Sequence, residues 1–218
     1  MNRPARLVTA ALAASAALLL TSCGSAGGDG SSSDKIAGAG TGETKSASPS
    51  VSAPADGIDR PEIKLPDDMK NVFEGQSAGD AVKDVILADN ARSVSSVDQA
   101  MASGDLKSSG MAFYYTDTAL TGVYEYAKNA IAENISWTGT VRYFDREVTV
   151  FSTASAAVTY CVDESQSNLK NSKTNEVQKT DTSADSYVYY NTAVKKNKDG
   201  VWQIWSLTED RGSQKCQP

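Results

Sequence analysis

Three cysteines, Cys23, Cys161 and Cys216, carry the most reactive side chains of this 218-residue sequence, and no histidine accompanies them. Histidine is the usual base for a serine or cysteine nucleophile and the commonest metal ligand, so Ser-His and Cys-His pairs are excluded. A zinc site built from cysteine alone needs more than two ligands. We therefore expect no metal, no cofactor and no catalytic residue, and cysteine chemistry limited to acylation, disulfide formation or free thiols.

Cys23 closes the segment Leu20–Cys23 (LTSC), which resembles a bacterial lipobox. The apolar run at residues 7–20 has the length of a secretory h-region and is too short to span a bilayer as a helix. We expect residues 1–22 to be a lipoprotein signal peptide and Cys23 to be acylated. Two or more acyl chains anchor a protein stably, which predicts attachment at the extracytoplasmic face of the cell membrane. The alternative is an ordinary signal peptide, with Cys23 incidental.

Cys161 and Cys216 then remain as an even pair in an exported protein, which favours a disulfide. The bridge would tie the C-terminal tail to a strand. It would close a loop of about 56 residues and contribute roughly 4 kcal/mol in the chain-entropy model. The alternative is two free thiols, one of them catalytic, although no histidine is present to activate a thiolate.

The segment 23–57 is expected to be the acylated cysteine followed by a flexible linker. Of the 34 residues at 24–57, 22 are Gly, Ser or Ala. Such a segment cannot bury enough apolar surface to offset the entropy lost on ordering. Gly38–Gly42 (GAGTG) lies within this linker, without a strand before it or a helix after it, so it is not a phosphate loop. The net charge is −6 for the whole sequence, and removal of the leader makes it more negative, which disfavours nucleic acid as a partner.

Residues 58–218 are expected to form a single α+β domain of about 160 residues. Two prolines in Arg60–Pro66 predict an extended lead-in. Apolar spacing predicts a helix over about 80–103, which Asp80 or Ser77 can cap and Gly104 can end. The buried stripe of this helix includes Val82, with Asn90 as a polar member that either faces a pocket or is satisfied by neighbouring backbone. A second helix is expected from Thr116 or Asp117 to about Asn134, with a buried face that includes Val123 and Tyr124.

Period-two patterns predict antiparallel strands in the remainder of the chain, with residues 164–184 as a long exposed loop or a hairpin extension. Asp145-Arg146 is interpreted as a turn between two strands, and Asp163 as a strand end. Lys198-Asp199-Gly200 predicts a hairpin turn. Helices followed by strands favour N-terminal helices packed on one face of a curved antiparallel sheet. The expected strands are 138–144, 147–151, 156–163, 186–196 and 201–208.

This order resembles the nuclear transport factor 2-like (SnoaL-like) cone, in which helices are wrapped by a curved sheet. More closely, the sequence resembles secreted actinobacterial lipoproteins of the type found in Streptomyces. The resemblance covers residues 58–218 and implies a cavity between the helices and the concave sheet face. The residues that carry it are Arg60–Pro66, Thr138–Thr140, Ala157–Asp163, Asp199–Trp202 and Arg211–Ser213 before Cys216.

Isomerases of the cone fold use a carboxylate base with Tyr or Asp donors in an apolar cavity. The resemblance therefore implies candidate catalytic residues in this sequence, two aspartates and four tyrosines, although none of them lies in a motif with fixed spacing. The alternative is that the two aspartates are turn and strand-end residues and that the tyrosines pack the sheet. At least one of Trp202 and Trp205 is expected in the core. The candidates are Asp145, Asp163, Tyr114, Tyr126, Tyr143 and Tyr160.

Three functions remain open. The absence of histidine and of a nucleophile motif, together with the tether, favours a non-catalytic domain that binds an envelope protein or a small apolar ligand. A second hypothesis is a self-assembling or partner-docking cone subunit, such as a homodimer, which a concentration-dependent mass would reveal. A third is a SnoaL-like enzyme on a small hydrophobic substrate, which an enclosed apolar pocket with a carboxylate of raised pKa would favour.

Overall fold

Strand β1 (Met69–Phe73) is the first regular element of the residues that the computed structural model describes, 56–107 and 109–218. Helices α1 (Ala81–Ser103), α2 (Met111–Tyr114) and α3 (Asp117–Ala132) follow it. The rest of the sheet then comes in one run, interrupted by a single turn of 3₁₀ helix at Ala184–Ser186. Its strands are β2 (Ile135–Ser152), β3 (Ser155–Asn171), β4 (Val177–Gln178), β5 (Tyr187–Lys196) and β6 (Trp202–Arg211).

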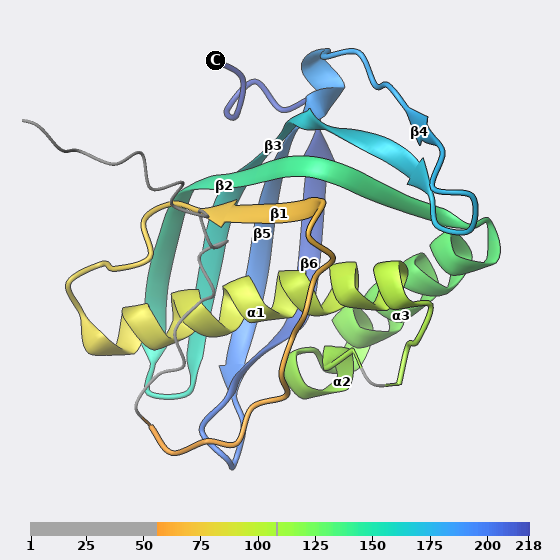
Figure 1. Cartoon of the computed structure of the whole chain (residues 1–218). Helices are drawn as coiled ribbons and strands as arrows, with labels where there is room; N and C mark the ends of the chain where they lie inside the picture. The colour runs from red at the N-terminus through yellow and green to blue at the C-terminus, as the bar shows by residue number, and fades with distance from the viewer. Residues whose placement is uncertain (1–55, 108) are drawn as a thin grey trace, which may run out of the picture. The chain divides into compact units, whose positions relative to one another are not determined.

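The strands form one sheet in the order β1-β2-β3-β5-β6, with β4 paired to β3. All neighbours are antiparallel except β1 and β2, which run parallel. The sheet is curved and open, and the helices cover one of its faces (Figure 1). The main core lies between α1, α3 and that face. The predicted class, N-terminal helices on a curved antiparallel sheet, is confirmed, although a short strand precedes the helices.

Local chemistry fixes the ends of α1. The Asp80 carboxylate accepts from the backbone N–H groups of Val82 and Lys83, both at 3.0 Å, which satisfies two of the free donors of the first turn. Gly104 ends the helix in the left-handed region, with φ of 71°, and its N–H bonds to the carbonyl of Ala100. A left-handed residue with this bond is a common helix stop, so both predicted boundaries are confirmed.

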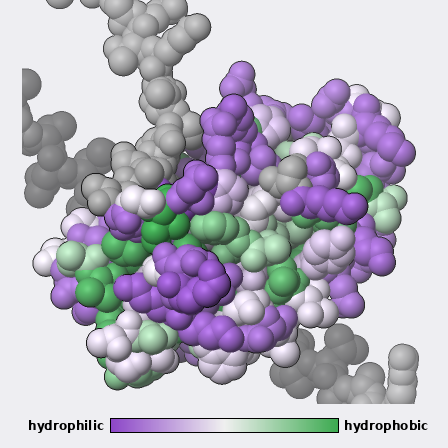
Figure 2. Space-filling view, turned by 90° about the horizontal axis from the view of Figure 1, so that it is seen from below, coloured by the Kyte–Doolittle hydropathy of each residue, from purple (hydrophilic) through white to green (hydrophobic). Residues whose placement is uncertain are grey.

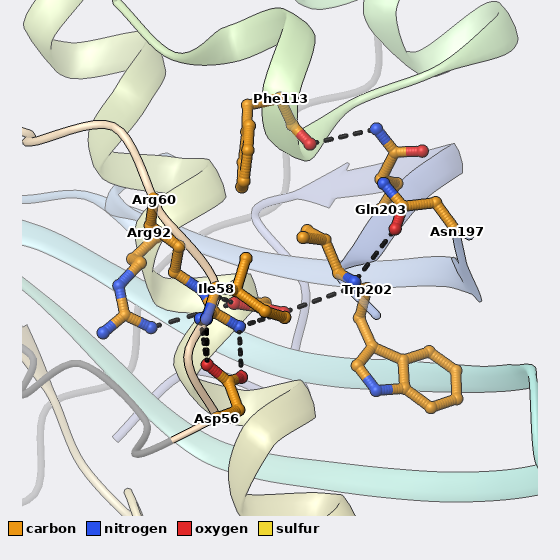
Figure 3. A network of polar contacts seen from close by, with 10 residues as sticks. Asp56, Ile58, Arg60, Arg92, Phe113, Asn197, Trp202 and Gln203 are labelled. Carbon is orange, nitrogen blue, oxygen red and sulfur yellow. Dashed lines mark hydrogen bonds and ion pairs between the residues drawn. The ribbon is translucent and has the colours of Figure 1, made fainter. Parts of the chain in front are cut away.

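The lead-in before β1 packs on α1 through buried charges. Arg60 donates to Asp56 at 2.7 and 2.8 Å and to Asp89 at 2.9 Å. Asp89, which is fully buried, also accepts from the backbone N–H of Trp202 at 3.0 Å and lies 3.8 Å from Arg92. Figure 3 shows this network joining the lead-in, α1 and β6. Arg60 of the lead-in thus pairs with a carboxylate that α1 buries, which offsets the cost of removing that charge from water.

Two sequence interpretations of the sheet are wrong. Asp145-Arg146 is not a turn, because β2 continues through it. Asp145 adopts a φ of 48° at a register shift between Phe144 and Glu147, which is a β-bulge. Asp163 does not end a strand either, since β3 runs on to Asn171. The segment after it extends the β3–β4 hairpin, which agrees with one of the two expectations for residues 164–184.

The predicted helix faces are correct in the middle and wrong at two positions. Val82 is 48% exposed and Tyr124 is 40% exposed, so neither lies on a buried stripe. Trp202 is buried and Trp205 is 41% exposed, as the expectation of at least one core tryptophan requires. Val150 and Phe151, near the turn of the β2–β3 hairpin, are also exposed. Figure 2 views the molecule from the end that carries the β2–β3 and β5–β6 turns and shows apolar residues gathered in patches between hydrophilic ones.

Candidate functional site

A cavity of about 840 Å³ lies between the helices and the concave face of the sheet. Helix α1 contributes Val94, Val97 and Met101 to its wall, and Val123 comes from α3. Residues of β2, β3, β5 and β6 complete it. A volume of this size is within the range of small-molecule sites, which are mostly apolar with a few placed polar groups.

Three tyrosines from neighbouring strands form an aromatic wall of the cavity. Tyr143 of β2, Tyr160 of β3 and Tyr190 of β5 all line it. The ring centroids of Tyr143 and Tyr160 are 6.3 Å apart, and those of Tyr160 and Tyr190 are 5.1 Å apart and stacked. Tyr160 and Tyr190 are cross-strand partners, and alternate residues share a face, which places all three rings on the concave side. Burial raises the pKa of each phenol, so all three are neutral at physiological pH.

Asp98 is a buried carboxylate in the same cavity. It lies on α1, is 9% exposed, and lines the pocket. Its Oδ2 accepts from the Asn71 amide at 2.7 Å and its Oδ1 accepts from the Trp137 indole N–H at 3.0 Å. Burial raises the pKa of Asp98 to about 6, the two donors oppose that rise, and the charge of Glu164 adds to it. A carboxyl group that changes protonation near neutral pH is suited to proton transfer as well as to ligand anchoring.

The entrance to the cavity combines exposed apolar and acidic side chains. Tyr126 of α3 is 61% exposed and Leu169 of β3 is 47% exposed, yet both line the cavity, so they mark its mouth. Asp181, Asp185 and Glu209 are exposed lining residues as well. A ligand would thus pass an apolar and negatively charged entrance before it reached the tyrosine wall.

Of the residues named from the sequence, the structure brings Tyr143 and Tyr160 into the cavity and places Tyr126 at its mouth. Tyr114 is fully buried but is not among the lining residues. Asp145 and Asp163 do not line it either, and Asp163 instead accepts from Arg142 at 3.2 Å.

Asn90, expected either to face a pocket or to be satisfied by backbone, does neither among the described residues. Its Oδ1 accepts from Arg146 at 3.1 Å, and the same guanidinium donates to the carbonyl of Leu87 at 2.6 Å. Arg146 thereby fixes the β-bulge of β2 to α1, which is a structural role.

The sequence reasoning did not single out Asp98, the most chemically distinctive residue of the cavity. A signal was present, because Asp98 follows Val94 by four residues and precedes Met101 by three, which places it on the buried stripe of the helix. Carboxylates are almost never fully buried without a partner. A charged residue on an apolar stripe was therefore the pattern that could have identified it.

The structure joins Cys161 to Cys216 by a disulfide with Cα atoms 5.4 Å apart, consistent with the expected pairing. Cys23 and the leader lie outside the described residues. Within residues 56–107 and 109–218, no group of three His, Cys, Asp or Glu side chains is placed to hold a metal ion. The helices of this part of the chain are all too short or too polar to cross a membrane.

No family model matches the chain, and no curated protein matches it. Among solved structures, the chain is similar to a ketosteroid isomerase-like protein from Erwinia carotovora atroseptica SCRI1043, with 16% identity and a TM-score of 0.41, covering 59% of this chain and 95% of that one. It is also similar to the intermembrane space region of the chloroplast protein ARC6, with 13% identity and a TM-score of 0.37, covering 59% of this chain and 97% of that one.

Proposed function

We propose that this protein is a lipoprotein of the secreted actinobacterial type, held at the extracytoplasmic face of the membrane, whose cone domain binds a small, largely apolar ligand. The observation that carries the binding role is the cavity of about 840 Å³ walled by Tyr143, Tyr160 and Tyr190. An open apolar cavity lowers stability relative to a filled core, so a fold that keeps one gains when a ligand occupies it. Asp98 supplies a placed polar group at the wall.

Binding is tested with the neutral fluorophore N-phenyl-1-naphthylamine and with native mass spectrometry. Both use the full chain carrying Cys23→Ser, which cannot be acylated. Saturable fluorescence enhancement, or a copurified small molecule, is the expected result. Val97→Phe, which adds a ring inside the cavity, should weaken the binding of the fluorophore.

Val85→Phe is the matched control, because Val85 is a partly buried residue of α1 that packs on the core without lining the cavity. Equal loss in both variants, or no saturable signal in the parent chain, would contradict the binding role.

The anchoring role rests on Leu20–Cys23 and on the linker that follows. A disulfide between Cys161 and Cys216 supports export, because disulfides persist in oxidising compartments. Cys23→Ala should release the protein from the membrane fraction into the medium. Retention of the Cys23→Ala variant at the membrane would contradict the anchor.

A second candidate function is favoured by Asp98. A carboxyl group with a pKa of about 6 in an apolar cavity is the arrangement expected of a general base near neutral pH. On this alternative, the protein is a SnoaL-like enzyme that moves a proton of a hydrophobic substrate. Incubation of the copurified molecule in D₂O would then give deuterium incorporation with the parent chain and none with Asp98→Asn. Tight binding without exchange would leave the non-catalytic role.

A further inference from the structure

The charged residues that line the cavity are strongly unbalanced in sign. Among the described residues that line the cavity, six carry a formal charge, and a single one of these six is basic. Cavity walls of low dielectric strengthen the field of such charges and raise the local concentration of ions of opposite sign. The acidic residues are Asp98, Glu164, Asp181, Asp185 and Glu209, and the basic residue is Arg211.

Arg211 is already occupied by protein acceptors. Its Nη1 donates to Glu164 Oε2 at 2.7 Å and to the carbonyl of Asp185 at 2.8 Å, and its Nη2 donates to Glu164 Oε1 at 3.2 Å. This bidentate ion pair with Glu164 is the strongest geometry of an arginine–carboxylate contact, and it raises the pKa of Arg211. An anionic ligand head would therefore have to displace Glu164 to reach the one cation of the lining.

In the part of the chain that the structure describes, the carboxylates of the three exposed acidic residues of the lining have no basic partner. Within the described ranges, Asp181, Asp185 and Glu209 form no salt bridge with a basic side chain. Glu209 accepts only the neutral hydroxyl of Tyr190, at 2.9 Å. All three are exposed and line the cavity, so their negative charges lie at its mouth.

Tyr143 gives an independent sign that the cavity is built to hold a ligand. Its side chain lines the cavity and is 7% exposed. The ring stacks on Phe73 at 4.5 Å between centroids, and its hydroxyl takes part in none of the hydrogen bonds within residues 56–107 and 109–218. A hydroxyl that faces the cavity without a protein partner is available to bond to a polar atom of a bound molecule.

We propose that the ligand is a cationic amphiphile whose ammonium head lies at the mouth among Asp181, Asp185 and Glu209, while its apolar body follows the tyrosine wall inward to Tyr143. This inference rests on the proposed ligand-binding function and narrows its chemistry. It predicts that the mouth favours ligands with a positive head group over those with a negative one. The contribution of the apolar interior to binding should be the same for every head group.

A matched series of three probes tests the selection: dodecylammonium, dodecanol and dodecanoate share one chain and differ in the charge of the head. Each would compete with N-phenyl-1-naphthylamine on the Cys23→Ser chain at low salt and about pH 8, below its micelle concentration. Dodecylammonium should bind at least about tenfold more tightly than dodecanoate, with dodecanol between them. Added salt should reduce that ratio, because the head lies near solvent.

Neutralising variants locate the selection. Asp181→Asn combined with Glu209→Gln should weaken dodecylammonium by about tenfold and leave dodecanol unchanged. Asp199→Asn is the matched control, since Asp199 is exposed in the β5–β6 hairpin and does not line the cavity.

The outcomes separate the two proposals. If no probe displaces the fluorophore and the fluorophore itself does not bind, ligand binding by the cavity fails. If the three probes compete equally, binding stands and the cationic head is overturned. Tightest binding of dodecanoate, or charge selection that persists in the doubly neutralised variant, would also overturn it.

Discussion

Trp137 donates its indole N–H to the Oδ1 of Asp98 at 3.0 Å, and this bond joins β2 to α1 at the wall of the cavity. The other carboxylate oxygen is held by Asn71 of β1. A carboxylate that is 9% exposed is thus positioned from two strands, and no basic side chain of residues 56–107 and 109–218 forms a salt bridge with it. The arrangement keeps Asp98 in place but does not fully offset the loss of hydration of its charged form.

Asp98 should make the protein less stable as the pH rises through about 6. Its pKa in the folded protein is raised to about 6 from the ordinary aspartate value of 3.8, so the folded state holds the proton more tightly than the unfolded state. The corresponding stability is fully present below about pH 4 and is lost above pH 6. A difference of about two pKa units corresponds to about 3 kcal/mol. Asp98→Asn should therefore raise the free energy of unfolding at pH 8 by about 1–3 kcal/mol.

Urea unfolding of both chains at a series of pH values measures this difference. Taking the difference removes the contribution of Asp56, whose pKa is lowered by its bonds to Arg60, and of other groups common to both chains. The stability that Asp98→Asn gains over the parent chain should shrink as the pH falls from 6 to 4. A difference between the chains that does not change with pH would show that Asp98 has an ordinary pKa in the folded protein.

Removal of Arg60 should destabilise the attachment of the lead-in. The Arg60 side chain is 5% exposed and that of Asp89 is fully buried, so Arg60→Met leaves a buried carboxylate short of its closest cation. Loss of one partner from a buried pair costs about 3–5 kcal/mol. Lys64→Met is the control, because Lys64 and Glu62 form an exposed pair at 3.0 Å. Its effect should stay within about 0.5 kcal/mol. Equal midpoints in urea for the two variants would contradict the role of Arg60.

The elements that were predictable from the sequence are those whose signals are local. Asp80 and Gly104 fix the ends of α1 by hydrogen bonds to residues within four positions. The local sequence is therefore enough to locate both ends of the helix. Asp145 shows the limit of such reasoning. An aspartate tolerates the left-handed region, which favours a turn locally, but pairing with β3 continues on both sides and makes the same residue a bulge. Strand β1 was missed because its partner lies about 70 residues away.

The same division applies to the site. Tyr143 and Tyr160 were among the candidates that the cone resemblance implied, and alternation along the strands explains why both face the cavity. The environment of Asp98 could not be derived in that way. Its two donors come from 27 and 39 residues away in the chain. The raised pKa also depends on the burial that Asp98 acquires when α1 packs against the sheet, which is a property of tertiary packing.

Gly139 should tolerate no side chain. It has a φ of 104°, and a Cβ built on it would lie 2.3 Å from the backbone oxygen of Gln166 on β3. Gly139→Ala should lower the free energy of unfolding by more than about 1 kcal/mol, because both the conformation and the strand contact oppose it. Gly122→Ala in α3 is the matched control. With no atom within 4 Å of a Cβ there, it should stabilise the chain by about 0.5–1 kcal/mol. Thermal unfolding of the two variants gives the sign of each effect.

Replacement of Cys161 and Cys216 by alanine should destabilise the domain by about 4 kcal/mol. The two residues are 55 positions apart, and the chain-entropy model gives about this value for a loop of that length. The bridge attaches the segment after β6 to the middle of β3, so its loss should first free the C-terminal residues to exchange amide hydrogens. Urea unfolding measures the stability, and hydrogen exchange shows where protection falls.

Alkylation without reductant provides the companion measurement on the parent chain carrying Cys23→Ser. Neither cysteine should be labelled until a reductant is added, and both should be labelled afterwards. Labelling of both before reduction would exclude the bridge. If alkylation shows the bridge but the double variant has an unchanged urea midpoint, noncovalent contacts hold the C-terminal segment in place and the bridge adds no stability.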